Sequence, residues 1–177
     1  IDPKELQSRF ILQNLPNIHN VIQIEQSHRY VFVLDSNSLR ILWPKKSLFF
    51  ENEIARYNID NPLSFALYVK PKHGTFRIVV LTKDQKVFYF KFNPRNPSEL
   101  ISLVNQTTVK VPITCMKYWF DYLLLVLNNG SLVVSKFIKK NLVFTRSRIQ
   151  KRMKISHIEV MFNYLFVVYE KKKLEIL

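Results

Sequence analysis

One pattern recurs four times along this chain of 177 residues and limits its possible folds more than any other feature. Each copy has a strand-like run, a second run that is almost wholly apolar, a tight polar turn and a third run. The four turns lie at residues 35–38, 83–86, 128–131 and 170–173. Their second residues are separated by 48, 45 and 42 positions along the chain. A recurrence at this period predicts a repeat architecture.

The composition of these runs predicts strands. β-branched and aromatic residues dominate them, as pleated strands prefer. The second runs, at 30–34, 76–81, 122–127 and 164–169, show little alternation between apolar and polar residues. That pattern is expected of a strand buried on both faces. In the third turn, Asn129-Gly130 signals a two-residue hairpin, in which both residues have positive φ.

The intervals between copies each leave room for one further strand. The candidates are residues 47–50, 100–111 and 141–144. The fourth copy contains only three runs, and residues 8–12 are a candidate for its missing strand, which would close a ring. The rival interpretation is a short N-terminal helix, with Asp2 as N-cap and Pro3 at the first helical position. The sequence leaves both interpretations open.

Across residues 21–177 this pattern resembles the WD40 family of β-propellers, whose blades have four strands and a period of about 40–45 residues. The resemblance lies in the architecture, because the Gly-His and Trp-Asp dipeptides of that family are absent. It implies an all-β propeller, or part of one, forming a single domain over residues 1–177. The blades are expected at about 19–62, 63–112, 113–154 and 155–177. An open edge would be covered by further blades or by a partner.

The sequence lacks the residue patterns of the common catalytic and cofactor sites. Two glycines are too few for a phosphate loop or a dinucleotide fingerprint. The lone Cys115 excludes an internal disulfide, and the four histidines lack metal-type spacing. A triad built from His28, Asp35 and a serine is better explained as polar residues at turns. We therefore expect no catalytic residue, no cofactor and no metal.

Two absences bear on where the chain acts. No apolar stretch approaches the ~20 residues of a membrane-spanning helix, so no membrane span is expected. The first residues do not resemble a signal peptide, and a single cysteine fits a reducing compartment. These features predict an intracellular location.

Charge is the strongest functional signal in the sequence. Lys and Arg outnumber Asp and Glu by 27 to 13, a formal net charge of +14, and residues 122–158 contain no acidic residue. The candidate binding residues of this basic region are Lys136, Lys139, Lys140, Arg146, Arg148, Lys151, Arg152 and Lys154. Such a region suits an acidic protein surface or the phosphates of nucleic acid, and favours the nucleus over the cytoplasm. The simpler alternative is a solvated outer strand whose lysines block edge pairing.

The resemblance to WD40 proteins implies rigid docking of other proteins. The predicted function is a non-catalytic scaffold within a larger intracellular complex, with acidic protein partners. The alternative is a subunit that contacts DNA or RNA through residues 136–154. The pair Trp119-Phe120 has two interpretations of its own, as core packing or as a binding hot spot at the propeller rim.

Overall fold

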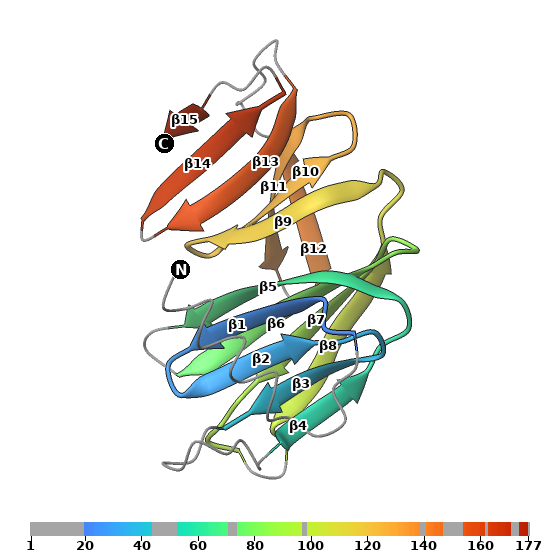
Figure 1. The fold of residues 1–177 in the computed structure, drawn as a ribbon, viewed down its shortest axis with the longest axis vertical. Coiled ribbons are helices and arrows are strands. Elements are labelled where there is room, and N and C mark those ends of the chain that lie inside the picture. The colour runs from blue at the N-terminus through green and yellow to red at the C-terminus, as the bar shows by residue number, and fades with distance from the viewer. Residues whose placement is uncertain are drawn as a thin grey trace.

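The computed structural model describes residues 20–43, 53–70, 74–96, 99–138, 141–146, 154–161, 163–170 and 174–176. All secondary structure in these ranges is β-strand, in four antiparallel sheets (Figure 1). The predicted all-β class and the four-fold strand pattern are therefore confirmed. Within the same ranges, no helix has the length and hydrophobicity needed to cross a membrane.

Each sheet is a meander in which consecutive strands are hydrogen-bonded neighbours. The first sheet contains β1 (Gln23–Ser27), β2 (Tyr30–Leu34), β3 (Ser38–Leu42) and β4 (Glu53–Asn58). The second contains β5 (Pro62–Lys70), β6 (Thr75–Thr82), β7 (Lys86–Phe92) and β8 (Ile101–Thr108). The third contains β9 (Ile113–Trp119), β10 (Tyr122–Leu127), β11 (Leu132–Ile138) and β12 (Asn141–Arg146). The fourth has three described strands, β13 (Ile155–Met161), β14 (Tyr164–Tyr169) and β15 (Leu174–Ile176).

The sheets pack face to face in chain order, and the second strand of a sheet supplies side chains to both of its interfaces. In β10, Leu123 and Leu125 belong to the core shared with the second sheet, whereas Leu124 and Val126 belong to the core shared with the fourth. All four are at most 1% exposed. The apolar runs without alternation are therefore explained by burial on both faces, as predicted. Strand β14 differs, because its Phe166 and Val168 remain partly exposed.

The predicted fourth strand of the first sheet was wrong. It lies at Glu53–Asn58, paired with β3, while residues 47–50 fall outside the described residues. Strand β4 carries Glu53 and Arg56 at the sheet edge, so it lacks the apolar character that had favoured 47–50. The predicted fourth strands at 100–111 and 141–144 are confirmed as β8 and β12. The rival predictions for the N-terminus, a strand at 8–12 or a short helix, also lie outside the described residues.

The hairpin at Asn129-Gly130 is confirmed, but its predicted turn type was wrong. Only Gly130 has positive φ, at +78°, while Asn129 does not. The Gly130 N–H donates to the Leu127 carbonyl at 2.8 Å, and the Leu127 N–H donates to the Ser131 carbonyl at 2.9 Å. This is a three-residue loop with glycine at its left-handed position, and not a two-residue turn.

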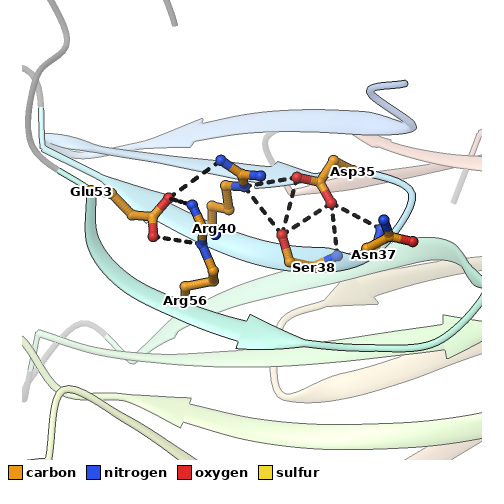
Figure 2. A network of polar contacts seen from close by, with 6 residues as sticks. All are labelled: Asp35, Asn37, Ser38, Arg40, Glu53 and Arg56. Carbon is orange, nitrogen blue, oxygen red and sulfur yellow. Dashed lines mark hydrogen bonds and ion pairs between the residues drawn. The ribbon is translucent and has the colours of Figure 1, made fainter. Parts of the chain in front are cut away.

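The turn between β2 and β3 is built around a buried carboxylate (Figure 2). Asp35 Oδ1 accepts the backbone N–H groups of Asn37 at 2.9 Å and Ser38 at 2.7 Å. Its Oδ2 lies 2.7 Å from Arg40 Nε on β3. Asp35 and Arg40 are only 3% and 9% exposed. An aspartate that bonds the backbone two and three residues onward is a common device for ordering a tight turn.

Candidate binding surface

The structure describes only part of the predicted basic region. Lys136 lies on β11, with its Nζ 3.0 Å from Asp121 Oδ2 and 5.2 Å from the centre of the Tyr122 ring. Lys154 is exposed immediately before β13, and Arg146 is the last residue of β12. Lys139, Lys140, Arg148, Lys151 and Arg152 lie outside the described residues. The joint binding role of these eight residues stays a prediction.

The residues considered for a triad are not brought together. His28 lies in the turn between β1 and β2, where its Nδ1 is 3.2 Å from Ser27 Oγ. Asp35 lies at the other end of β2 and is engaged by Ser38 and Arg40. Among the described residues, no group of three or more His, Cys, Asp or Glu could hold a metal ion.

Cys115 lies on β9 and is half-buried. Its thiol donates a hydrogen bond to the Ile158 carbonyl, with 3.6 Å between sulfur and oxygen. Burial raises the pKa of this thiol above its ordinary value, so the nucleophilic thiolate is disfavoured. This environment supports the interpretation of Cys115 as a structural thiol.

The first strands of the sheets bring polar residues together. Gln23 on β1 donates from Nε2 to the Phe65 carbonyl at 2.9 Å and accepts the Phe65 N–H at 2.8 Å, which joins the first two sheets. The same Nε2 lies 2.7 Å from Glu25 Oε1. Burial raises the pKa of Glu25 to about 7, while the positive charge of Lys117 opposes the shift. Lys117 itself forms an ion pair with Glu159 at 3.0 Å.

Replacing Glu25 with glutamine should stabilise the fold in a pH-dependent way. A carboxyl whose folded pKa is about 7 costs stability as the pH rises from about 4.5 to 7, because the unfolded chain ionises first. We expect Glu25→Gln to raise the free energy of unfolding by about 1–3 kcal/mol at pH 8 and to leave it unchanged at pH 4. Urea unfolding of the variant and the native chain at pH 8 and at pH 4 measures the two differences in free energy. An equal gain at both would show that ionisation is not the cause.

Exposed apolar side chains gather at the tips of two neighbouring hairpins. These residues, here named the hairpin-tip patch, are Trp119, Phe120, Tyr122, Met161 and Tyr164. Phe120, Tyr122, Met161 and Tyr164 are 45–57% exposed. The two turns lie next to each other in Figure 1, and Trp119 Nε1 donates to the Asn163 carbonyl at 3.1 Å.

Trp119 and Phe120 have different environments, and each fits one of the two interpretations of the pair. Trp119 is partly buried and packs against the core between the third and fourth sheets, with its ring 5.5 Å from that of Phe120. Phe120 points to solvent from a backbone with φ of +52°. A bulky residue is rarely found in that region, and the equivalent turns of the first two sheets also have positive φ, at His28 and Gly74, so the conformation belongs to the repeated turn. Phe120 therefore has the exposure expected of a hot spot, and the partly buried Trp119 ring packs beside it.

A second feature, here named the seam pocket, lies between the first and second sheets. It has a volume of about 170 Å³, and its lining includes His28, Arg29, Tyr30, Gly74, Phe76 and Arg95. Sequence reasoning missed it, because these residues come from three separate segments. The one available signal was the repeat, which places His28 and Gly74 at the equivalent first turns of consecutive sheets.

Comparison with known proteins places this geometry among the propellers. No protein-family model matches the chain, and no curated protein matches it. The WD40 domain of SCAP from fission yeast is similar in structure, with a TM-score of 0.59 and 12% identity over 89% of this chain and 42% of that one. The β-propeller domain of Cps50 (Swd1) from Myceliophteria thermophila has a TM-score of 0.65 and 11% identity over 89% and 53%. BBS1N, in complex with ARL6DN, has a TM-score of 0.62 and 14% identity over 92% and 53%.

The chain thus spans about half the length of these propellers or less. At such low identity the likeness concerns the fold and carries no residue's role with it. The four stacked meanders and these likenesses together show that the chain has the fold of WD40-like β-propeller blades.

Proposed function

We propose that this chain is a non-catalytic propeller scaffold that docks another protein through the hairpin-tip patch, inside a larger intracellular assembly. The observation that carries the proposal is the gathering of four well-exposed apolar side chains at the tips of two adjacent hairpins. Exposed apolar residues scattered singly need no explanation, whereas a contiguous group marks an interaction site. Aromatic side chains are also enriched among binding hot spots.

The surroundings of the patch support a protein partner. Lys136 lies over the Tyr122 ring, and Asp121 holds both Lys136 and Arg77, the latter at 2.5 Å. An apolar centre with ion pairs beside it is the usual anatomy of a protein interface. The structurally similar BBS1N is itself described in complex with ARL6DN. The net charge of +14 favours an acidic partner and a nuclear location.

Removing the aromatic rings should abolish docking without unfolding the chain. In the triple variant Phe120→Ser, Tyr122→Ser and Tyr164→Ser, we expect proteins that co-purify from extracts of the native cell to be lost. Each substitution lies on the surface, so the melting temperature should change little. The measurement is quantitative affinity capture, with the captured proteins identified by mass.

The matched control removes three other exposed apolar side chains, which lie outside the hairpin-tip patch. Leu63, Leu103 and Val111 are 37–40% exposed, and their triple serine variant should retain the partners. Equal loss of partners from both triple variants would contradict a specific role for the hairpin-tip patch. Full retention of partners by the aromatic triple variant would contradict it as well.

The alternative function is contact with DNA or RNA through residues 136–154, and it rests on the charge of that region. The apparent mass of the chain, measured by light scattering with DNA or RNA added at low and at high salt, distinguishes this alternative from the protein scaffold. Phosphate contacts release counterions, so a mass shift that disappears at high salt would favour the alternative. No shift at low salt would leave the protein scaffold as the better explanation.

A further inference from the structure

The seam pocket concentrates positive charge. Arg29 and Arg95 place two guanidinium groups on its lining, His28 adds an imidazole, and none of the lining residues that the structure describes is acidic. The Arg29 guanidinium carbon lies 5.2 Å from the centre of the Trp43 ring. Within the described part of the chain, neither guanidinium forms an ion pair with a carboxylate. The pocket therefore holds two strong anion-binding groups whose charges the described fold does not neutralise.

The walls between these charges are apolar. The Tyr30 and Phe76 rings lie edge to face, 5.5 Å apart, and both side chains are largely buried. Val69 and Pro94 add further apolar lining. The nearest atom to a Cβ built on Gly74 would be Arg95 Nη2 at 4.0 Å, so this glycine leaves space beside the guanidinium. The arrangement suits a ligand with a short apolar stem and a charged end.

The volume limits the size of that ligand. Pockets for drug-sized molecules measure roughly 300–1,000 Å³, which is larger than the seam pocket at about 170 Å³. A space of this size is closer to that of one amino-acid side chain. The pocket is therefore better matched to one residue of a larger partner than to a free metabolite.

We propose that the seam pocket binds the side-chain carboxylate of a glutamate or aspartate in a protein partner. The planar guanidinium fork matches a carboxylate in a bidentate pair, and the apolar walls would hold the methylene stem. The inference rests on the proposed scaffold function, because the carboxylate would belong to a protein that the scaffold docks. It concerns a different site from the hairpin-tip patch, so each can fail independently.

A carboxylate fits the pocket better than a phosphate. A phosphoryl group presents three strongly accepting oxygens and carries a charge close to −2. The described lining offers charged donors from Arg29 and Arg95 and the imidazole of His28, and its other residues are mainly apolar. Burying a phosphate oxygen against Val69, Phe76 or Pro94 without a donor would carry a desolvation cost. A carboxylate exposes fewer oxygens to that wall.

The position of the pocket suits a partner that also reaches the hairpin-tip patch. The turn between β1 and β2, which supplies His28 and Arg29, lies on the same side of the view as the β9–β10 and β13–β14 turns (Figure 1). Trp43, 43% exposed, adds an apolar contact beside Arg29. An acidic segment with apolar neighbours is the partner chemistry that this side of the chain presents.

The test titrates the whole chain with N-acetyl-glutamate amide while the arginine side-chain N–H signals are followed by NMR. We expect saturable shifts of the Arg29 and Arg95 Nε–H signals. N-acetyl-glutamine amide, which has the same shape without the charge, should produce none. The variant Arg95→Gln should weaken binding at least tenfold, because it removes a charge-assisted hydrogen bond.

Lys83→Gln is the matched control, since it removes one exposed positive charge from the turn between β6 and β7. It should change the affinity by less than twofold. Equal weakening by both variants, or shifts that do not saturate, would overturn the pocket as a site. Tighter binding of inorganic phosphate than of the glutamate probe would overturn the choice of carboxylate. Retained capture of partners through the hairpin-tip patch would still leave the scaffold function standing.

Discussion

Replacing Gly130 with alanine is expected to destabilise the fold by at least about 3 kcal/mol. A Cβ at this position would lie 2.4 Å from Lys154 Cβ and 2.8 Å from Lys154 Cα, so backbone would have to move. The φ of +78° adds a further cost for any L side chain. The Gly130 carbonyl also accepts the Ile155 N–H at 2.9 Å, and this bond joins the third sheet to the fourth. Denaturant unfolding would measure the loss.

Gly74→Ala provides the matched control for this prediction. Gly74 also has positive φ, at +57°, but the nearest atom to its added Cβ is a flexible arginine terminus at 4.0 Å. Only the conformational cost applies there, and we expect a loss of about 1 kcal/mol. Similar losses at the two glycines would show that contact with Lys154 contributes nothing.

Replacing Asp35 with alanine is expected to cost about 3–5 kcal/mol. The substitution removes the carboxylate that lies 2.7 Å from Arg40 Nε and that accepts the Ser38 N–H at 2.7 Å (Figure 2). It leaves a largely buried guanidinium without its nearest negative charge. Glu53 stays 3.5 Å from Arg40 Nη1, but at this longer distance it compensates the buried charge less than Asp35 does, and a poorly compensated buried charge costs more than the pair itself stabilises. Chemical denaturation followed by circular dichroism would measure the effect.

A double variant separates the charge effect from the loss of the turn. Adding Arg40→Met to Asp35→Ala removes the guanidinium that has lost its nearest carboxylate, and we expect it to recover at least about 1 kcal/mol. Arg56→Ala is the control, because this exposed arginine bonds Glu53 at 2.7 Å in the same network. Its loss should stay below about 1 kcal/mol. Strictly additive losses for Asp35 and Arg40 would contradict coupling between them.

The strands that were predictable are those whose local pattern reflects burial. Residues 122–127 are apolar throughout because Leu123 and Leu124 face different cores, so their environment is visible in the sequence itself. The edge strand β4 was misplaced because its outward face is polar. For an edge strand, pairing with the neighbouring strand decides the position, and that pairing leaves little pattern in the local sequence.

The candidate sites were less predictable than the fold. Phe120 was identified only as one of two alternatives, since exposure depends on how the third and fourth sheets meet. The charges of residues 136–154 were evident, yet the sequence did not show that Lys136 pairs with Asp121. The seam pocket was not anticipated at all. Its arginines come from the turn between β1 and β2 of the first sheet and from the connection between β7 and β8 of the second.

The sequence by itself determined most of the strands, their four-fold recurrence and the excess of positive charge. These properties depend on side chains close together in the chain, whose alternation and turn preferences act locally. The tertiary structure alone decided that Phe120 points to solvent, that Asp35 and Arg40 are buried, and that Arg29 and Arg95 share one pocket. Those outcomes depend on packing between separate sheets, because a side chain's exposure and partners are set by whatever surface the neighbouring blade brings against it.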